Sequence, residues 1–197
     1  MVSAQFQVKS SAVSGGYTEI MPASSLVALE EYLSTSYHPD QEYVHGELVE
    51  RRVGTYTHSR LQALLTMFFG ALEDALSIRV ITEQRIRVLN TVGEKRYRIP
   101  DVCLVRTPFE HEEVFTRPPY LVIEILSADD RVADTLLKTS DYSRFGIQHI
   151  WIVDPEAEKL FSADSQGIRE IEDLVGQLPE INLSVDFNLL LGKLRQA

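Results

Sequence analysis

The chain reads Arg98-Ile-Pro-Asp101, then Tyr120-Leu-Val-Ile-Glu124-Ile-Leu-Ser127, then Asp134-Thr-Leu-Leu-Lys138. This stretch places two carboxylates, Asp101 and Glu124, at apolar segments that have the composition of strands. Burying a carboxylate is costly unless a cation or hydrogen-bond donors compensate its charge. The stretch therefore predicts a place where two acids meet a compensating cation, and a hard divalent metal is the simplest one.

Side chains alternate along a strand, which sorts the residues around Glu124 onto two faces. One face carries Leu121, Ile123 and Ile125, and the other carries Val122, Glu124 and Leu126. If the two strands pair, Asp101 and Glu124 converge on one Mg²⁺ or Mn²⁺ ion, whose remaining ligands are water and substrate phosphate. The alternative is structural: Asp101 is a strand-entry residue and Glu124 pairs with an arginine. The residues alone leave both interpretations open.

At these positions the chain resembles the PD-(D/E)XK nuclease superfamily, which has the restriction-endonuclease-like fold, and within it the Uma-type endonuclease family, a domain of unknown function. The similarity extends from about Ser24 to Leu191 and depends on the order and spacing of short motifs: Tyr43-Val-His-Gly46-Glu47-Leu48, His58, Pro100-Asp101-Val102, Val122-Ile-Glu124-Ile-Leu-Ser127, Asp134, Lys138, Tyr142, Gly146-Ile147 and Trp151-Ile-Val-Asp154-Pro155. The resemblance implies an α/β fold with a mixed central sheet flanked by helices. It also implies a Mg²⁺- or Mn²⁺-dependent phosphodiesterase that acts on DNA.

One departure from the superfamily pattern concerns its lysine. The usual pattern has a lysine two residues after the glutamate on the same strand face, and this chain has Leu126 there. The resemblance suggests Lys138, on the following helix, as the replacement, with Asp134 orienting it. We then expect the Lys138 ammonium within about 5 Å of the Glu124 carboxylate, where opposite charges interact appreciably. Without the neighbouring acids, Asp134 and Lys138 would be interpreted as an exposed helical ion pair.

Two further residues are candidates for the same site. Glu47 follows a predicted turn at Gly46, and it is either a solvated hairpin residue or a third acid that assists the metal directly or through water. His58 lies in the first turn of a predicted helix, where histidine usually caps or packs, and the resemblance favours a contact with phosphate or a site water. The predicted catalytic residues are therefore Asp101, Glu124, Lys138, Glu47 and His58. The predicted metal ligands are Asp101, Glu124 and Glu47.

Length and composition indicate one globular domain. The chain has 197 residues, and we place a single domain at residues 21–197 after a Ser- and Gly-containing tail at 1–20 that we expect to be mobile. Apolar residues make up 44% and charged residues 24%, which is ordinary for a globular protein. No apolar run approaches the roughly 20 residues that span a bilayer, and no signal-peptide pattern is visible, so we expect a cytoplasmic protein without membrane contact. The single Cys103 is interpreted as a buried core residue.

The charge distribution bears on nucleic-acid binding. A net charge of −10 argues against a protein that coats nucleic acid nonspecifically. Between Arg79 and Arg106, however, seven basic residues outnumber three acidic ones. This stretch either follows a phosphate backbone beside the predicted metal, or it forms a strand face whose arginines pair with acids elsewhere.

Hydrophobic periodicity predicts the order of the elements. Helices are expected at Pro22 to Ser36, at Thr57 to Leu76 with Thr57 as N-cap, and at Arg131 to Phe145 before the C′ glycine Gly146. Strands are expected at Glu42 to Glu50 with a reversal at Gly46, at Ile78 to Leu89, at Lys95 to Val105, around Glu124, at Ile147 to Val153, and in a hairpin of Lys159 to Phe161 with Gly167 to Ile171. The strand, helix, strand order between 120 and 153 is a crossover, so its two strands should be parallel. The leucine-rich end, Leu174 to Leu191, should pack on the body of the protein or on a partner.

These features favour a metal-dependent DNA endonuclease. The rival hypothesis is a catalytically silent nuclease-fold module that binds nucleic acid or a protein partner, including a second copy of itself in a homodimer. Leu126 in the usual lysine position and the acidic net charge favour that rival. A small phosphoester hydrolase would use the same residues in a pocket of different size, and the sequence does not separate these substrates.

Overall fold

The computed structural model describes residues 26–51, 54–89, 95–128 and 130–195; the predicted tail at 1–20 and the predicted turn at 90–93 lie outside them. The helices are α1 (Leu29–Ser34), α2 (Tyr56–Gly70), α3 (Glu73–Leu76), α4 (Val132–Phe145) and α5 (Phe187–Leu194), with a 3-10 helix, η1, at Pro179–Ile181. The strands are β1 (Gln41–Val44), β2 (Glu47–Glu50), β3 (Ile78–Thr82), β4 (Ile86–Leu89), β5 (Lys95–Arg98), β6 (Val102–Arg106), β7 (Leu121–Ile125), β8 (His149–Asp154), β9 (Lys159–Asp164), β10 (Gly167–Glu170), β11 (Val175–Leu178) and β12 (Leu183–Asp186). That residues 21–197 form a single domain stays a prediction.

A six-stranded mixed sheet forms the centre of the protein, in the order β10-β9-β8-β7-β6-β3. Strands β7 and β8 are parallel, because α4 carries the chain from the end of one to the start of the other. The other neighbouring strands are antiparallel. The predicted α/β fold, with a mixed central sheet flanked by helices, is confirmed, and so is the parallel crossover.

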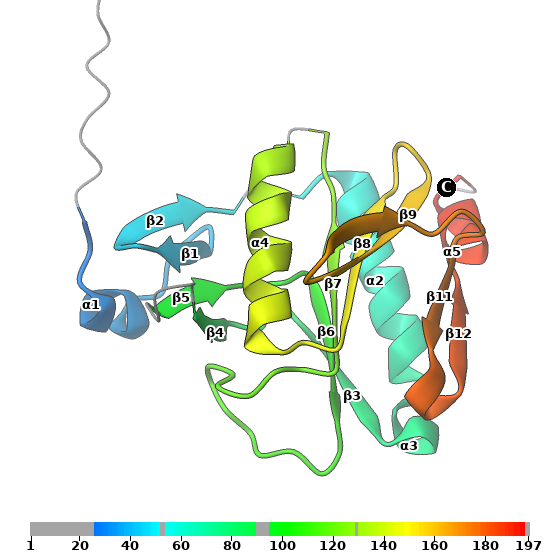
Figure 1. The fold of residues 1–197 in the computed structure, drawn as a ribbon, viewed down its shortest axis with the longest axis horizontal. Coiled ribbons are helices and arrows are strands. Elements are labelled where there is room, and N and C mark those ends of the chain that lie inside the picture. The colour runs from blue at the N-terminus through cyan, green and yellow to red at the C-terminus, as the bar shows by residue number, and fades with distance from the viewer. Residues whose placement is uncertain (1–25, 52–53, 90–94, 129, 196–197) are drawn as a thin grey trace, which may run out of the picture.

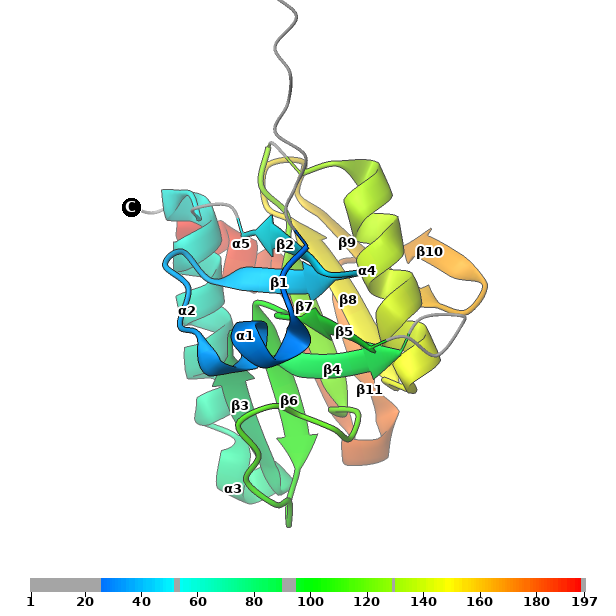
Figure 2. The same cartoon turned by 90° about the vertical axis from the view of Figure 1, so that its left-hand side faces the viewer.

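The two faces of this sheet are covered differently (Figure 1). Helices α2 and α5 and the β11-β12 hairpin pack on the face that carries Leu121, Ile123 and Ile125. Helix α4 covers the opposite face, where Tyr142 packs with Val122. A second sheet, in the order β2-β1-β5-β4, lies beside α4 on that same face (Figure 2). Glu124 shares the α4 face with Val122, so this face holds the acid.

Two strands that the sequence predicts as continuous are each broken. Residues 78–89 divide into β3 and β4, and residues 95–105 divide into β5 and β6, so that one half of each run joins each sheet. The first break is at Glu83, whose φ of 54° is uncommon for a non-glycine residue and does not fit a strand, and the second is at Pro100, which has no N–H for a ladder. The prediction was wrong because a β-rich run does not reveal a change of sheet. Asp101 lies directly after the second break.

The helix predictions also need correction. The predicted helix at 57–76 is divided into α2 and α3, and the N-cap is Thr55, whose side chain accepts a hydrogen bond of 3.2 Å from the His58 N–H. Of the helix predicted for residues 22–36, the described residues form only the shorter α1. The buried residue of α1 is Tyr32, whose ring stacks on that of Tyr43. Leu33, an apolar residue of the same helix, is 43% exposed.

Other predictions are confirmed. The β1-β2 and β9-β10 hairpins form, and Gly146 ends α4 with a φ of 95°, a conformation that favours glycine. The leucine-rich end packs on the body of the protein, where Phe187 meets the indole of Trp151. Cys103 is buried, and burial raises its pKa to about 12. Within the part of the chain that the structure describes, no helix has the length and apolar character to cross a bilayer.

Candidate active site

Asp101 and Glu124 lie on neighbouring strands. β6 and β7 are antiparallel with Val102 opposite Ile123, so Asp101, the residue before β6, lies across from Glu124. The Ile125 N–H donates a hydrogen bond of 2.8 Å to Asp101 Oδ2. Both acids are buried, and both line one pocket of about 420 Å³. The two carboxylates therefore lie in one pocket, and that they share a metal ion stays a prediction.

Positively charged and donor groups surround the Asp101 carboxylate. Arg51 Nη2 lies 2.7 Å from Oδ1, and His58 Nε2 lies 3.3 Å from Oδ2. Burial alone would raise the pKa of Asp101, but the hydrogen bond and charge of His58 and the charge of Arg51 outweigh it and lower the pKa. The hydrogen bond to Asp101 in turn raises the pKa of His58. His58 therefore contacts an acid of the site from the first turn of α2.

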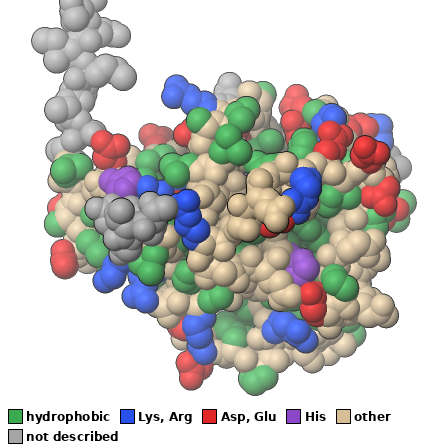
Figure 3. Space-filling model, viewed as in Figure 1, with side chains coloured by type: hydrophobic (Ala, Val, Ile, Leu, Met, Phe, Trp, Pro, Cys, Tyr) green, Lys and Arg blue, Asp and Glu red, His purple; other side chains and the backbone are tan. Residues whose placement is uncertain are grey.

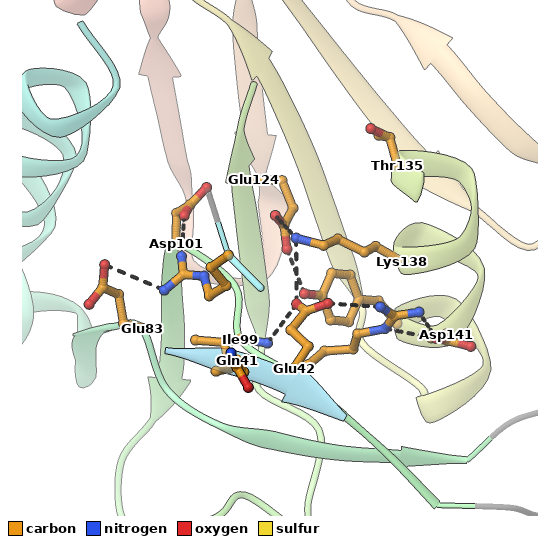
Figure 4. A network of polar contacts seen from close by, with 12 residues as sticks. Gln41, Glu42, Glu83, Ile99, Asp101, Glu124, Thr135, Lys138 and Asp141 are labelled. Atoms are coloured by element: carbon orange, nitrogen blue, oxygen red, sulfur yellow. Dashed lines mark hydrogen bonds and ion pairs between the residues drawn. The ribbon is translucent and has the colours of Figure 1, made fainter. Parts of the chain in front are cut away.

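Glu124 has a different environment. The Tyr142 hydroxyl donates to its Oε1 at 2.5 Å, and Lys138 Nζ lies 3.2 Å from its Oε2. Burial raises the pKa of Glu124, Lys138 partly offsets this, and the charge of Asp101 raises the pKa further. Burial would lower the pKa of Lys138, but Glu124 and Glu42 raise it above its ordinary value, so the amine is a cation. The predicted approach of Lys138 to Glu124 is confirmed (Figure 4).

A third acid of the site, Glu42 on β1, was missed in the sequence. Its Oε1 lies 3.5 Å from Lys138 Nζ and accepts from the Ile99 N–H at 3.1 Å, while Oε2 accepts from Arg98 at 2.8 Å. Burial would raise the pKa of Glu42, but Lys138 and Arg98 lower it. Glu47, which we predicted in this role, is exposed at the start of β2, opposite Val44. Both acids lie near the turn at Gly46, and the register of the hairpin places them on the same face, so alternation does not distinguish them. Glu42 is buried because β1 is an inner strand paired with both β2 and β5, whereas Glu47 lies on the edge strand.

A buried cluster of ion pairs lies directly behind Glu42. Asp141 on α4 is fully buried and accepts from Arg96 at 2.9 Å and from Arg98 Nη2 at 2.7 Å. Arg96 and Arg98 belong to the basic stretch that the sequence analysis offered as a phosphate track, and both are buried. On the face shown in Figure 3, Lys and Arg side chains are scattered among acidic and apolar ones. For Arg96 and Arg98, therefore, the second interpretation of the basic stretch holds: these arginines pair with acids elsewhere in the fold.

The pocket as a whole carries excess negative charge. Besides Glu42, Asp101 and Glu124, it is lined by the acids Asp40, Glu50, Glu83, Asp130 and Asp134. Its permanent cations are Arg51, Arg98 and Lys138. Like charges in a concave site reinforce one another, so the pocket attracts cations.

Comparison with known proteins gives the family. The model of the Uma2 family, described as "Putative restriction endonuclease", matches residues 29–188. This chain belongs to the Uma2 family. Among solved structures, a crystal structure of a "putative nuclease belonging to DUF820" from Anabaena variabilis matches with a TM-score of 0.70 and 20% identity, and the match covers 84% of this chain and 98% of that one. At this identity the likeness concerns the fold. None of the curated proteins matches this chain.

Membership of the Uma2 family supports a nuclease-like role, and restriction-endonuclease-like families generally use divalent metals. Within the described ranges, no group of three or more His, Cys, Asp or Glu side chains is arranged to hold an ion by itself. Mg²⁺, however, commonly takes one or two carboxylates and completes its shell with water and phosphate oxygens. Asp101 Oδ1 and each oxygen of Glu124 have one described contact and two lone pairs, so these three oxygens can still accept a metal ion. The donor set of this Uma2 protein therefore fits a divalent ion.

Proposed function

We propose that this protein is a Mg²⁺- or Mn²⁺-dependent endonuclease that cleaves DNA. One observation carries the proposal. Two buried carboxylates, Asp101 and Glu124, meet in one pocket, and the Lys138 ammonium lies 3.2 Å from Glu124. This constellation supplies two oxygen ligands and a fixed cation at a place where a phosphodiester would be attacked. Membership of the Uma2 family supports the same reaction class.

Asp101 and Glu124 would hold the metal, which when bound polarises a phosphate and lowers the pKa of a coordinated water. Lys138 remains protonated, so its role is to stabilise charge that develops on the phosphate and to orient the attacking water. Tyr142 fixes the Glu124 carboxylate. Glu42 fixes the lysine from the side opposite Glu124, and His58 fixes Asp101. Tyr142, Glu42 and His58 are therefore positioning residues.

Nicking of supercoiled plasmid DNA tests this function. We expect the wild-type protein to nick DNA with Mg²⁺ or Mn²⁺ and to lose activity in EDTA. Lys138→Met should lower the rate by about 100-fold or more, because charge stabilisation in a reaction of this kind is worth that much. It should still be stabilised by Mn²⁺, since the amine serves the reaction and not the ion. Lys193→Met, an exposed lysine on α5, is the matched control and should cleave normally.

A second function is favoured by the acid excess of the pocket. A catalytically silent module would keep the metal-binding acids without performing cleavage. Such a module shows a Glu124-dependent rise in melting temperature with Mn²⁺, because a ligand that binds the native state stabilises it. It shows no nicking with either metal. Equal nicking by the wild type and Glu124→Gln would instead reveal a contaminating nuclease.

A further inference from the structure

Arg51 already occupies one oxygen of the Asp101 carboxylate. It follows β2, and its backbone N–H donates to the carbonyl of Asp40 at 3.2 Å. Its Nη2 lies 2.7 Å from Asp101 Oδ1, whereas Oδ2 accepts from Ile125 and faces His58. An ion that used Oδ1 would lie within a few ångströms of the guanidinium. Two cations at that distance repel each other strongly in a site of low dielectric.

Arg51 compensates the same charges that a metal would compensate. Burial would lower the pKa of its guanidinium, but the charges of Asp101, Glu124, Glu83 and Glu42 raise it. The side chain is 16% exposed, so it is packed into the pocket and does not extend into solvent. In the absence of a metal, Arg51 and Lys138 are the cations nearest to the two carboxylates that we propose as ligands.

Glu83 provides a second position for the same guanidinium. Its Oε1 lies 3.5 Å from Arg51 Nη1, and its side chain is 50% exposed. The Glu83 N–H donates to the Asp101 carbonyl at 3.3 Å, and its φ of 54° is uncommon for a non-glycine residue. Figure 4 shows Glu83 beside Asp101 on the side away from Glu124. A small rotation of Arg51 toward Glu83 would therefore take positive charge away from the pair of carboxylates.

We propose that Arg51 and Glu83 set the metal affinity of this site: Arg51 competes with the divalent ion for Asp101, and Glu83 receives the guanidinium when the ion binds. This inference depends on the proposed function for its metal site, but not on cleavage. The competition is reciprocal, so whatever weakens the hold of Arg51 on Asp101 strengthens metal binding, and whatever removes its second position weakens metal binding.

Calorimetric titration of Mn²⁺ into the full-length chain tests the pair. Arg51→Met should bind Mn²⁺ about tenfold more tightly than the wild type, and Glu83→Gln about tenfold more weakly, which are ordinary coupling magnitudes. In the double variant the effect of Glu83→Gln should nearly vanish, because no guanidinium remains to be received. Glu50→Gln, an exposed acid of the same pocket, is the control for general pocket charge, and its effect should be the same with and without Arg51.

The outcomes separate this inference from the proposed function. If wild-type protein and Arg51→Met both fail to bind Mn²⁺, the metal site is wrong and both proposals fall. If the wild type binds Mn²⁺ and Arg51→Met binds it equally or more weakly, only the proposed competition is wrong. The same holds if Glu83→Gln weakens Mn²⁺ binding equally in the wild type and in Arg51→Met. Melting in EDTA shows whether Arg51→Met is folded. If it is not, Arg51→Gln is used, because its amide keeps a donor for Asp101 without the positive charge, and Glu83→Gln should then have little further effect.

Discussion

Two neighbouring clusters of this protein use the same residue types for different ends. The scaffold cluster, Glu42, Arg96, Arg98 and Asp141, contains two acids and two arginines and is buried throughout. The site cluster, Asp101 and Glu124 with Arg51 and Lys138, lines a pocket to which six further acids contribute, Glu42 among them. In the first cluster, charges are matched and every arginine ties α4 to the smaller sheet. Around the second cluster, the acids that line the pocket outnumber its arginines and lysine, and this charge imbalance would favour a bound metal ion.

Breaking the scaffold cluster should have the largest effect. Asp141→Asn leaves Arg96 and Arg98 buried with one charge partner removed, and the loss of one partner of a buried pair costs about 3–5 kcal/mol of unfolding free energy. Urea denaturation measures this. Asp134→Asn, an exposed acid on the same helix, should change stability by less than about 0.5 kcal/mol. Similar values for the two variants would contradict the distinction between scaffold and pocket.

The site cluster should respond in its metal affinity and not in its fold. Glu124→Gln keeps an oxygen that accepts from Tyr142 but removes the charge of a proposed ligand. Mn²⁺ affinity should therefore fall by about 100-fold or more, because mutation of residues that only hydrogen-bond to metal ligands already lowers metal affinity by about 10- to 100-fold. Calorimetry measures the affinity, and circular dichroism confirms the fold. Wild-type affinity in this variant would show that the ion binds elsewhere.

Nucleic-acid binding should itself depend on metal. The excess of acids repels phosphate unless a cation is present, so we expect DNA affinity in Ca²⁺, which supports binding without cleavage in many Mg²⁺ sites, to exceed that in EDTA by about tenfold, with a steep dependence on salt. Fluorescence anisotropy of a labelled duplex measures both. Tight binding in EDTA would show that DNA contacts a surface other than this pocket.

The pH dependence of stability distinguishes Glu124 from the other buried acids, Asp101 and Glu42, by sign. The pKa of Glu124 is raised by burial, so its ionised form destabilises the metal-free fold. That destabilisation is absent below the ordinary value of 4.5 and grows as pH rises through it toward the folded pKa. In EDTA, Glu124→Gln should therefore gain stability relative to the wild type as pH rises from acid to neutral. The lowered pKa values of Glu42 and Asp101 act with the opposite sign and affect both proteins alike. A difference that does not vary with pH would contradict the assignment.

The smallest effect is expected where the same kind of pair lies on the surface. Arg117 contacts Glu110 at 2.8 Å, but both side chains are more than half exposed. Exposed pairs contribute little, so Glu110→Gln should change the unfolding free energy by less than about 0.5 kcal/mol. A loss comparable to that of Asp141→Asn would show that burial is not what separates these ion pairs.

The sequence predicted some of these residues and missed others for identifiable reasons. Alternation along β7 was enough to place Glu124 on an otherwise apolar face, and the family resemblance suggested Lys138 as its neighbour. Glu42 was missed because the sequence shows two acids around the Gly46 turn but not which of them faces the core. Arg51 was missed because its contact with Asp101 depends on how the two sheets pack, and no local sequence pattern indicates that packing.

The basic stretch between Arg79 and Arg106 shows the same limitation, because the sequence does not reveal which of its arginines are buried. Arg96 and Arg98 look like surface cations in a basic strand, and they are buried because β5 belongs to the second sheet and both arginines pair with Asp141 on α4. The break at Pro100 between β5 and β6 is followed directly by Asp101, which lines the pocket. One change of sheet thus takes Arg96 and Arg98 out of the possible phosphate track and positions an acid of the site.

A crystal soaked with Mn²⁺ tests the central claim most directly, because anomalous scattering locates the ion without assuming activity. We predict one Mn²⁺ ion that contacts the carboxylates of both Asp101 and Glu124, with the Arg51 guanidinium withdrawn from Asp101 toward Glu83. A site without Mn²⁺ in which Arg51 still holds Asp101, or an ion bound away from both carboxylates, would contradict the account.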